Sequence, residues 1–441
     1  MGDLRRDSRH ITREFALGHL ERAEMATLDS WRHFLKAPKT LELVEAKLIG
    51  RTSMSPAVAA GPCKVQMNTL QDFSFSMTTT GSPIPLLQAI NHHHEHRDDG
   101  TSRLRLEGKE ADGTEWLCGW TMPQNMSFGD QSIIEGKLTS LMVDQPLGSP
   151  NSSTEFIFHA DHLHPLARVM GTNRLQQKEI DLLGSKIKFA YERENKVVSI
   201  TVPHSDQLPP TWTENWIAEP LRIMFGQCVA PRLAARNIGG MAIIHILPQP
   251  ALDVASWSSF WRDEKAESFF DTYARLLQFI ALAPDARKVE INEVTRFYDE
   301  LARVAGSSRW VMSLTLAGCT EGLAMLLRPF LKTELVAQEK ADSKAAAALV
   351  EKIEALEGDN ELKKAAVAAL RPKGMSTERT LKWMAQADVI THDQLATWRK
   401  LRNSVMHGKI LYPYASQEED ARMLQLMDVV RSLTDELLKQ T

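Results

Sequence analysis

The chain lacks closely spaced cysteines. Its four cysteines, Cys63, Cys118, Cys228 and Cys319, are scattered over 441 residues without a Cys-x-x-Cys pair. This spacing indicates neither a thiolate zinc site nor a disulfide framework. Isolated cysteines in a large chain are typical of a reducing compartment.

The sequence also lacks a long hydrophobic run and a strong charge bias. The opening MGDLRRDSRH is followed by no apolar segment of the signal-peptide type. No stretch reaches about 18 uncharged apolar residues, so we expect a cytoplasmic protein with no membrane partner. The formal net charge is −4, which gives no global attraction to nucleic acid. Any contact with RNA must therefore come from a local basic surface.

Two common catalytic motifs are missing, and no cofactor is indicated. The chain contains no Gly-x-Ser-x-Gly nucleophile elbow. The segment from Gly129 to Lys137 is not a P-loop, because its glycine spacing is wrong and no Ser or Thr follows the lysine.

The composition, with 43% hydrophobic and 24% charged residues, is that of a folded protein, and the length predicts two or three units.

Residues 41–205 predict a β-rich region. Apolar and polar residues alternate in Lys186–Phe189 and in Arg103–Leu106, which is the pattern of half-buried strands. Asp112-Gly113 predicts a hairpin turn, since glycine accepts a positive φ, and residues 193–195 predict another. Several short strands in series favour an antiparallel sheet folded as a sandwich or a partial barrel.

Helical segments are expected around these strands. Residues 1–36 have a helical pattern with mixed charges. Residues 207–212, which include two prolines, predict a break, and a helix is expected from Trp216 to about Arg236. The apolar segment Met241–Pro248 predicts one last strand.

After about residue 255 the helical period dominates. Thr333–Glu357 is rich in Ala, Glu, Lys and Leu, which favour helices, and Gly358 is the expected cap. Residues 371–374 are expected to form a linker, and Ser416 to Glu419 form a capping-box pattern that opens the last helix. In that helix four apolar residues share one stripe, namely Leu426, Val430, Leu433 and Leu437.

The predicted fold class is α+β, with a β-rich part followed by an all-helical part. We assign residues 1–250 to a β-rich sensing or regulatory domain with an N-terminal helix. Residues 251–300 are assigned to a helical connector, and residues 301–441 to a helical bundle.

The segment from Thr391 to Gly408 concentrates the residues that suggest chemistry. Thr391 and Gln394 form a capping-box pattern, and Gly408 is a suitable residue just past a helix end. His407 is then expected in the last turn, where the negative end of the helix dipole favours a protonated imidazole. Histidine changes charge near neutral pH, so it can serve as base and acid in turn.

Arg402 and Asn403 accompany this histidine. Asn403 and His407 are four residues apart and share a helix face, and the long side chain of Arg402 can reach the same face. A cation, an amide and an imidazole suit metal-free RNA cleavage through the 2′-hydroxyl. Arg402 would hold the phosphate and stabilise its added charge. A two-fold dimer would supply two copies of each group, because acid and base catalysis require more than one histidine.

The arrangement Arg402-Asn403-x-x-x-His407, late in a helical region and followed by one final helix, resembles the Arg-x4–6-His signature of the HEPN superfamily. The resemblance covers about residues 300–441. It implies a helical bundle, homodimerisation through the motif helices, and metal-independent endoribonuclease activity that leaves 2′,3′-cyclic phosphate and 5′-hydroxyl ends. In many relatives an upstream helix carries a glutamate, and Glu321 matches it here.

A β-rich half joined to such a domain resembles the architecture of ApeA-type anti-phage proteins. This resemblance implies a toxin or abortive-infection effector. Its trigger, either a phage component or a nucleotide, would act at the N-terminal domain.

Two alternatives remain open at this point. The helical bundle could be a non-catalytic module for dimerisation or RNA binding. The histidine-rich segments 92–96 and 159–164 could instead form the metal site of a hydrolase, although both are expected in loops at strand ends. Spacing alone is weak evidence, because Arg5 and His10 show the same four-residue interval. Arg222, Arg232 and Arg236 could also present a basic helix face.

Overall fold

The computed structural model describes residues 27–50, 57–95, 103–127, 129, 131–147, 150, 152–161, 163–172, 176–250, 259–263, 265–370, 376–408 and 416–440. The chain forms two compact units. One comprises residues 1–218, 229–252 and 263–271, and is called the sheet unit below. The other comprises residues 219–228, 253–262 and 272–441, and is called the helical unit.

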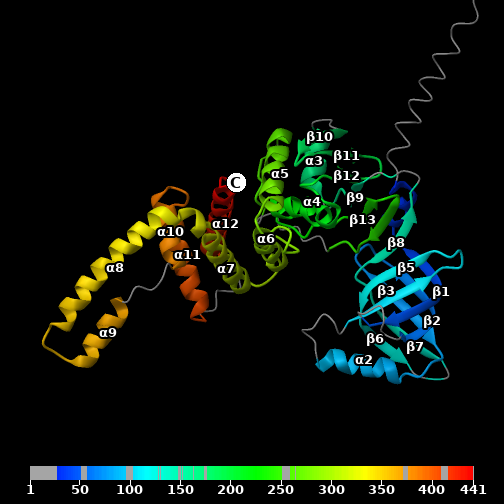
Figure 1. The fold of residues 1–441 in the computed structure, drawn as a ribbon, viewed down its shortest axis with the longest axis horizontal. Helices are drawn as coiled ribbons and strands as arrows, with labels where there is room; N and C mark the ends of the chain where they lie inside the picture. Colours follow the sequence, from blue (N-terminus) through cyan, green and yellow to red (C-terminus); the bar gives the residue numbers. More distant parts are fainter. Residues whose placement is uncertain are drawn as a thin grey trace, which may run out of the picture. The chain divides into compact units, whose positions relative to one another are not determined.

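The sheet unit contains a single antiparallel sheet of 14 strands (Figure 1). The strand order is β10-β11-β12-β9-β13-β14-β8-β5-β4-β1-β2-β3-β7-β6. The strands are β1 (Lys39–Ile49), β2 (Ala57–Met67), β3 (Phe73–Thr79), β4 (Leu104–Lys109), β5 (Glu115–Thr121), β6 (Pro123–Ser127), β7 (Ser132–Lys137), β8 (Leu141–Pro146), β9 (Ser153–His159), β10 (Gln177–Leu182), β11 (Ser185–Glu192), β12 (Val197–Pro203), β13 (Leu233–Ile238) and β14 (Met241–Ile246). The predicted β-rich class is confirmed.

Alternating burial explains why these segments are strands. In β3 every second residue is buried, from Phe73 to Thr79, so one face contributes to the core. The two predicted hairpins are present. Gly113 has a φ of 96° in the turn between β4 and β5, and residues 193–196 connect β11 to β12.

Helical elements in the sheet unit differ from the predicted ones. A short 3₁₀ helix, η1 (Asp29–Leu35), is described where the predicted N-terminal helix was expected to end, and residues 1–26 of that prediction lie outside the described residues. Two helices, α2 (Ile84–Glu95) and α3 (His164–Thr172), occupy positions where loops were expected. His92, His93 and His94 therefore belong to a helix.

The predicted helix from Trp216 to Arg236 is wrong in both its start and its end. Helix α4 (Pro210–Phe225) begins within the predicted break, because a proline suits the first turn of a helix. It ends before Gly226, which has a φ of 57°. Residues Leu233–Ile238 form β13, which pairs with β9 and β14. Arg222, Arg232 and Arg236 therefore do not share a helix face.

The helical unit contains the later helices (Figure 1). They are α5 (Ala266–Ala281), whose first residues belong to the sheet unit, α6 (Glu293–Val304), α7 (Arg309–Leu327), η4 (Arg328–Leu331), α8 (Lys332–Glu354), α9 (Asn360–Leu370), α10 (Thr377–Gln386), α11 (His392–Met406) and α12 (Gln417–Leu438). No strand follows β14 in the described residues. Residues 272–300, assigned to a connector from the sequence, belong to this unit, and the expected linker at 371–374 lies outside the described residues.

Helix α7 is at the centre of this unit. It contacts α6, α10, α11 and α12. The segment Arg309–Leu331 is apolar and long enough to cross a membrane by composition alone. One face of this helix, with Leu316, Leu323 and Leu327, is buried against neighbouring helices, whereas Leu314 and Met325 on the other face are exposed. The predicted stripe on α12 is also buried, including Leu426 and Val430.

Two glycines of α7 give a matched test of this packing. A Cβ on Gly322 would lie 2.1 Å from Cζ of Phe297 on α6, whereas a Cβ on Gly318 would meet nothing within 4 Å. We expect Gly322→Ala to lower the free energy of unfolding by about 1–2 kcal/mol through overpacking. Gly318→Ala should raise it by about 0.5–1 kcal/mol through helix propensity. Urea denaturation of both variants tests this, and shifts of the same sign would contradict the close approach of α6 and α7.

Candidate functional site

Helices α7 and α11 bring two of the four predicted site residues together. Nε of Arg402 on α11 donates to Oε1 of Glu321 on α7 at 2.7 Å. The side chains are 40% and 31% exposed, respectively, so the pair lies at the surface of the bundle. An ion pair at this exposure contributes little to stability, about 0–1 kcal/mol. Its main effect is to fix the orientation of the guanidinium.

The contact with Glu321 leaves the outer nitrogens of Arg402 available. The bond to Glu321 uses Nε, and neither Nη atom bonds to another described residue. The guanidinium also lies 5.9 Å from the ring centre of Trp398, a residue that is buried in the same helix. A planar guanidinium held on one edge by a carboxylate, with an aromatic ring nearby, can offer its Nη atoms to a phosphate.

Helix α11 has the caps that its sequence predicts. Thr391 accepts a hydrogen bond from the backbone N–H of Gln394, and the Gln394 side chain accepts one from the Thr391 N–H, so the capping box is complete. Its buried stripe consists of Leu395, Trp398, Leu401 and Val405. The other end is closed by Gly408, which has a φ of 69°.

His407 is the C-cap of α11. Its backbone N–H donates to the carbonyl of Asn403 at 3.1 Å. Both side chains are exposed, and neither is hydrogen-bonded to Glu321 or Arg402 in the described part of the chain. Lys400 is also exposed and lies seven residues before His407, so Lys400, Asn403 and His407 share one face of the helix. The sequence analysis did not name Lys400 as a site residue, although the interval of seven residues already places it on the same helix face as His407.

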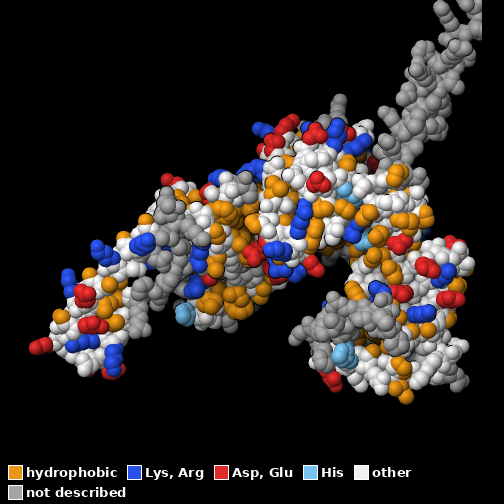
Figure 2. Space-filling view, viewed as in Figure 1, with side chains coloured by type: hydrophobic (Ala, Val, Ile, Leu, Met, Phe, Trp, Pro, Cys, Tyr) orange, Lys and Arg blue, Asp and Glu red, His pale blue; other side chains and the backbone are white. Residues whose placement is uncertain are grey.

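Apolar side chains surround the ion pair at the surface. On α7, Leu314 and Met325 are 36% and 52% exposed, and their spacing places them on the same face as Glu321. On α11, Met406 is 63% exposed, one turn after Arg402. Figure 2 shows hydrophobic side chains at the surface of this unit.

The histidine-rich segments do not form a metal site in the described residues. No group of three or more His, Cys, Asp or Glu side chains with metal-binding geometry is found there. His159, at the end of β9, is half-buried, and burial lowers its pKa. His96 and His162 lie outside the described residues, as do the Arg5 and His10 pair.

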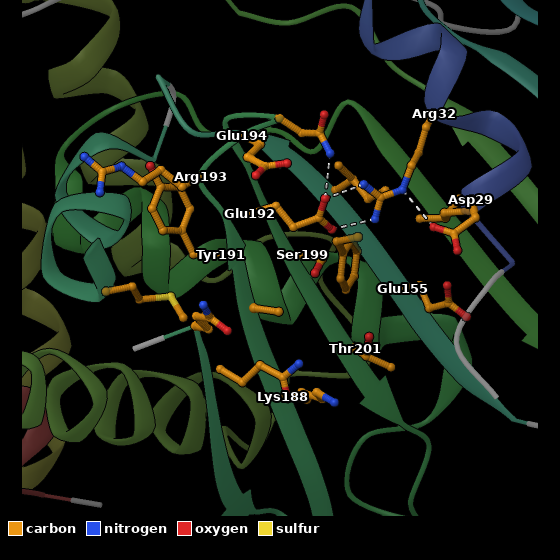
Figure 3. Close-up of a pocket in the computed structure, with 18 of the residues that line it drawn as sticks. Asp29, Arg32, Glu155, Lys188, Tyr191, Glu192, Arg193, Glu194, Ser199 and Thr201 are labelled. Atoms are coloured by element: carbon orange, nitrogen blue, oxygen red, sulfur yellow. Dashed lines mark hydrogen bonds and ion pairs between the residues drawn. The ribbon is translucent and has the colours of Figure 1, made fainter. Parts of the chain in front are cut away.

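A second candidate site lies in the sheet unit, and the sequence predicted none of its lining residues as site residues. A cavity of about 1210 Å³ is lined by residues of η1, α3 and strands β9 to β12 (Figure 3). The signal in the sequence was weak, because polar residues on the outer face of a strand, such as Lys188, Ser199 and Thr201, usually face solvent.

No family model matches the chain, and no curated protein or solved structure matches it either. Any functional assignment must therefore be argued from the residues and their geometry.

Proposed function

We propose that this protein is a metal-independent endoribonuclease of HEPN type, with Arg402, Asn403 and His407 as its catalytic group. One observation carries the proposal. Glu321 holds Arg402 through Nε alone, which leaves the two Nη atoms for a phosphate at the surface where His407 ends α11. Glu321 is thus a positioning residue, and it acts on the substrate through Arg402.

The reaction that this group supports is an internal transesterification. The 2′-oxygen of a ribose attacks the adjacent phosphorus, and the bond from phosphorus to the 5′-oxygen breaks. A base takes the proton of the 2′-hydroxyl, and an acid protonates the leaving 5′-oxygen. The Arg402 guanidinium stabilises the extra negative charge on the phosphoryl oxygens, while Asn403 orients the phosphate or the imidazole.

Active protein would be a homodimer. One His407 cannot act as base and acid at the same moment, and a two-fold axis near α7 and α11 would supply a second one. The exposed Leu314, Met325 and Met406 support this arrangement, since methionine is enriched at protein–protein interfaces.

The cellular role that fits is a cytoplasmic toxin or anti-phage effector that causes abortive infection. An unrestrained ribonuclease would damage its own cell, so its activity must be controlled. The sheet unit, which forms a separate compact unit, is suited to receive the trigger.

The proposal is tested by incubating the purified full-length protein with a mixed RNA pool in EDTA. We expect fragments that carry 2′,3′-cyclic phosphate and 5′-hydroxyl ends. Because the mechanism uses no metal ion, chelation should leave the rate unchanged. Cleavage that disappears with EDTA and returns with Zn²⁺ or Mg²⁺ would contradict the proposal and favour a metal hydrolase.

A non-catalytic module for dimerisation or RNA binding is the second candidate. It is favoured by the ion pair itself, because Arg402 paired with Glu321 can serve as an ordinary surface contact between α7 and α11. This candidate predicts that the protein binds RNA without cleaving it. It also predicts that the C-terminal part of the chain, produced alone in a cell, is not toxic.

A further inference from the structure

Helices α10 and α11 carry a local excess of positive charge. Together they contain five Lys or Arg residues and two Asp or Glu residues, in a chain whose formal net charge is −4. After Asp393 in its first turn, α11 contains Arg399, Lys400 and Arg402 but no further Asp or Glu. The two helices contact each other (Figure 1). They therefore form a local basic surface of the kind that attracts a polyanion.

Arg399 borders the proposed catalytic group. It lies three residues before Arg402 and four before Asn403. Residues at these intervals are neighbours on a helix surface, with about 5–6 Å between their Cβ atoms. None of the three belongs to the buried stripe of α11. The side chain of Arg399 therefore starts one helical turn from the arginine that would hold the scissile phosphate.

Arg399 shares its acid partner with a second cation. Its Nη2 lies 3.0 Å from Oε1 of Glu378 on α10, and Nζ of Lys382 lies 3.6 Å from the same oxygen. Neither cation pairs with another carboxylate in the described part of the chain. Two positive charges thus face one negative charge, and one positive charge is uncompensated. Both cations reach solvent, since the side chains of Arg399 and Lys382 are 37% and 54% exposed.

The ion pair at Arg402 is balanced by comparison, because Arg402 faces Glu321 alone. Arg399 and Lys382 therefore supply a net attraction for a polyanion that the catalytic arginine lacks. An RNA strand fits this distribution of charge, since it carries a negative charge at every nucleotide. The phosphate next to the scissile one can then meet a guanidinium and an ammonium, which both donate to phosphate oxygens.

We infer that Arg399 and Lys382 bind the phosphate adjacent to the scissile one in a bound RNA strand. This inference rests on the proposed ribonuclease function and adds binding contacts outside the catalytic group. Glu378 is a positioning residue, because its carboxylate holds the two cationic side chains together.

The experiment measures binding without cleavage. The full-length protein is titrated with a short, labelled single-stranded RNA whose riboses are all 2′-O-methylated, so that no attacking hydroxyl is present. Fluorescence anisotropy is recorded at several KCl concentrations. Arg399→Gln and Lys382→Gln should each weaken binding at low salt, because either substitution leaves one cation for one carboxylate. Each should also reduce the steepness of log K against log salt concentration by about 0.7, the value for one phosphate contact with a single strand.

Kinetics on unmodified RNA separate a binding role from a catalytic one. Both variants should raise KM and leave kcat nearly unchanged, because a contact with the neighbouring phosphate is the same in the ground state and in the transition state. A fall in kcat at constant KM would contradict a pure binding role.

Arg275→Gln is the matched control. Arg275 lies 3.1 Å from Asp435 and is 45% exposed, so it resembles Arg399 in both respects. Its surroundings are balanced, because Lys439 contacts Asp435 and also Glu436. The affinity of this variant for RNA and its salt dependence should equal those of the wild type.

Three results would overturn the inference. The wild type fails to bind the methylated RNA, the salt dependence is the same in the wild type and in both variants, or Arg275→Gln changes it as much as they do. If Arg399→Gln does not fold, Lys382→Gln decides, since its side chain is more exposed. The proposed ribonuclease function fails separately: unmodified RNA would then be bound but not cleaved, while both variants would still differ from the control in salt dependence.

Discussion

Replacing His407 with alanine should reduce RNA cleavage by about 10²–10⁴-fold, the usual contribution of a general acid or base. The folded state should not change, because the side chain is exposed and only its backbone N–H is bonded, to Asn403. The substitution therefore separates chemistry from stability. The measurement is the initial rate of cleavage of a labelled RNA in EDTA, with circular dichroism as the check on folding.

His392→Ala is the control for this variant. His392 is the first residue of the same helix and is also exposed, but it lies four turns away from the proposed site. Its cleavage rate should equal that of the wild type. If both variants cleave at the wild-type rate, His407 has no catalytic role and the proposed catalytic group is wrong.

Arg402→Lys tests whether catalysis needs the planar guanidinium of Arg402 or only its positive charge. Lysine keeps the positive charge opposite Glu321 but lacks the planar fork of donors. We expect a large loss of cleavage with RNA binding largely retained, since the charge remains and the two Nη donors are gone. Full activity of this variant would show that Arg402 acts only as a point charge.

The motif helix was predictable because all of its signals are local. Both caps, the buried stripe and the position of His407 follow from residues within one segment of 18 residues. The partner of Arg402 was harder to predict, since Glu321 is 81 residues away in sequence. The structure pairs it with Arg402 and places Nε of Arg328 3.4 Å from Thr380.

The region around residues 207–240 was not predictable by the same rules. Pro209 and Pro210 suggested a break, but proline is also favoured at the start of a helix. The segment Leu233–Ile238 contains alanine and arginine, which favour helices in isolation, and its strand state depends on pairing with β9 and β14. Tertiary contacts thus overrode local preference.

Arg232 shows most clearly what such contacts add. It precedes β13 and is fully buried. Its guanidinium donates to the backbone carbonyls of Phe34, Leu70 and Leu247 at 2.9, 3.2 and 2.8 Å. It also lies 4.8 Å from the ring centre of Phe73. Burial lowers its pKa to about 10, so it remains charged at neutral pH. One side chain therefore joins η1, the loop after β2 and the end of β14.

Arg232→Met should lower the free energy of unfolding of the sheet unit by about 2–4 kcal/mol. Two effects oppose each other. Removing a buried charge relieves a desolvation cost, but carbonyls that lose their donor cost about 1–3 kcal/mol each. Leu70 keeps a second bond, from the N–H of Gln249, whereas no other donor to Phe34 or Leu247 is found among the described residues. The unsatisfied carbonyls should therefore dominate.

Hydrogen exchange measured by mass spectrometry tests whether the destabilisation by Arg232→Met is confined to the sheet unit. Amides of β13 and β14 should exchange faster in Arg232→Met, while those of α7 and α12 should not change, because they belong to the other compact unit. Arg193→Met is the control, since Arg193 is exposed in the turn between β11 and β12, and it should shift stability by less than about 0.5 kcal/mol. A more stable Arg232→Met protein would mean that desolvation of the guanidinium outweighs its three hydrogen bonds. Arg232 would then be retained for a reason other than stability.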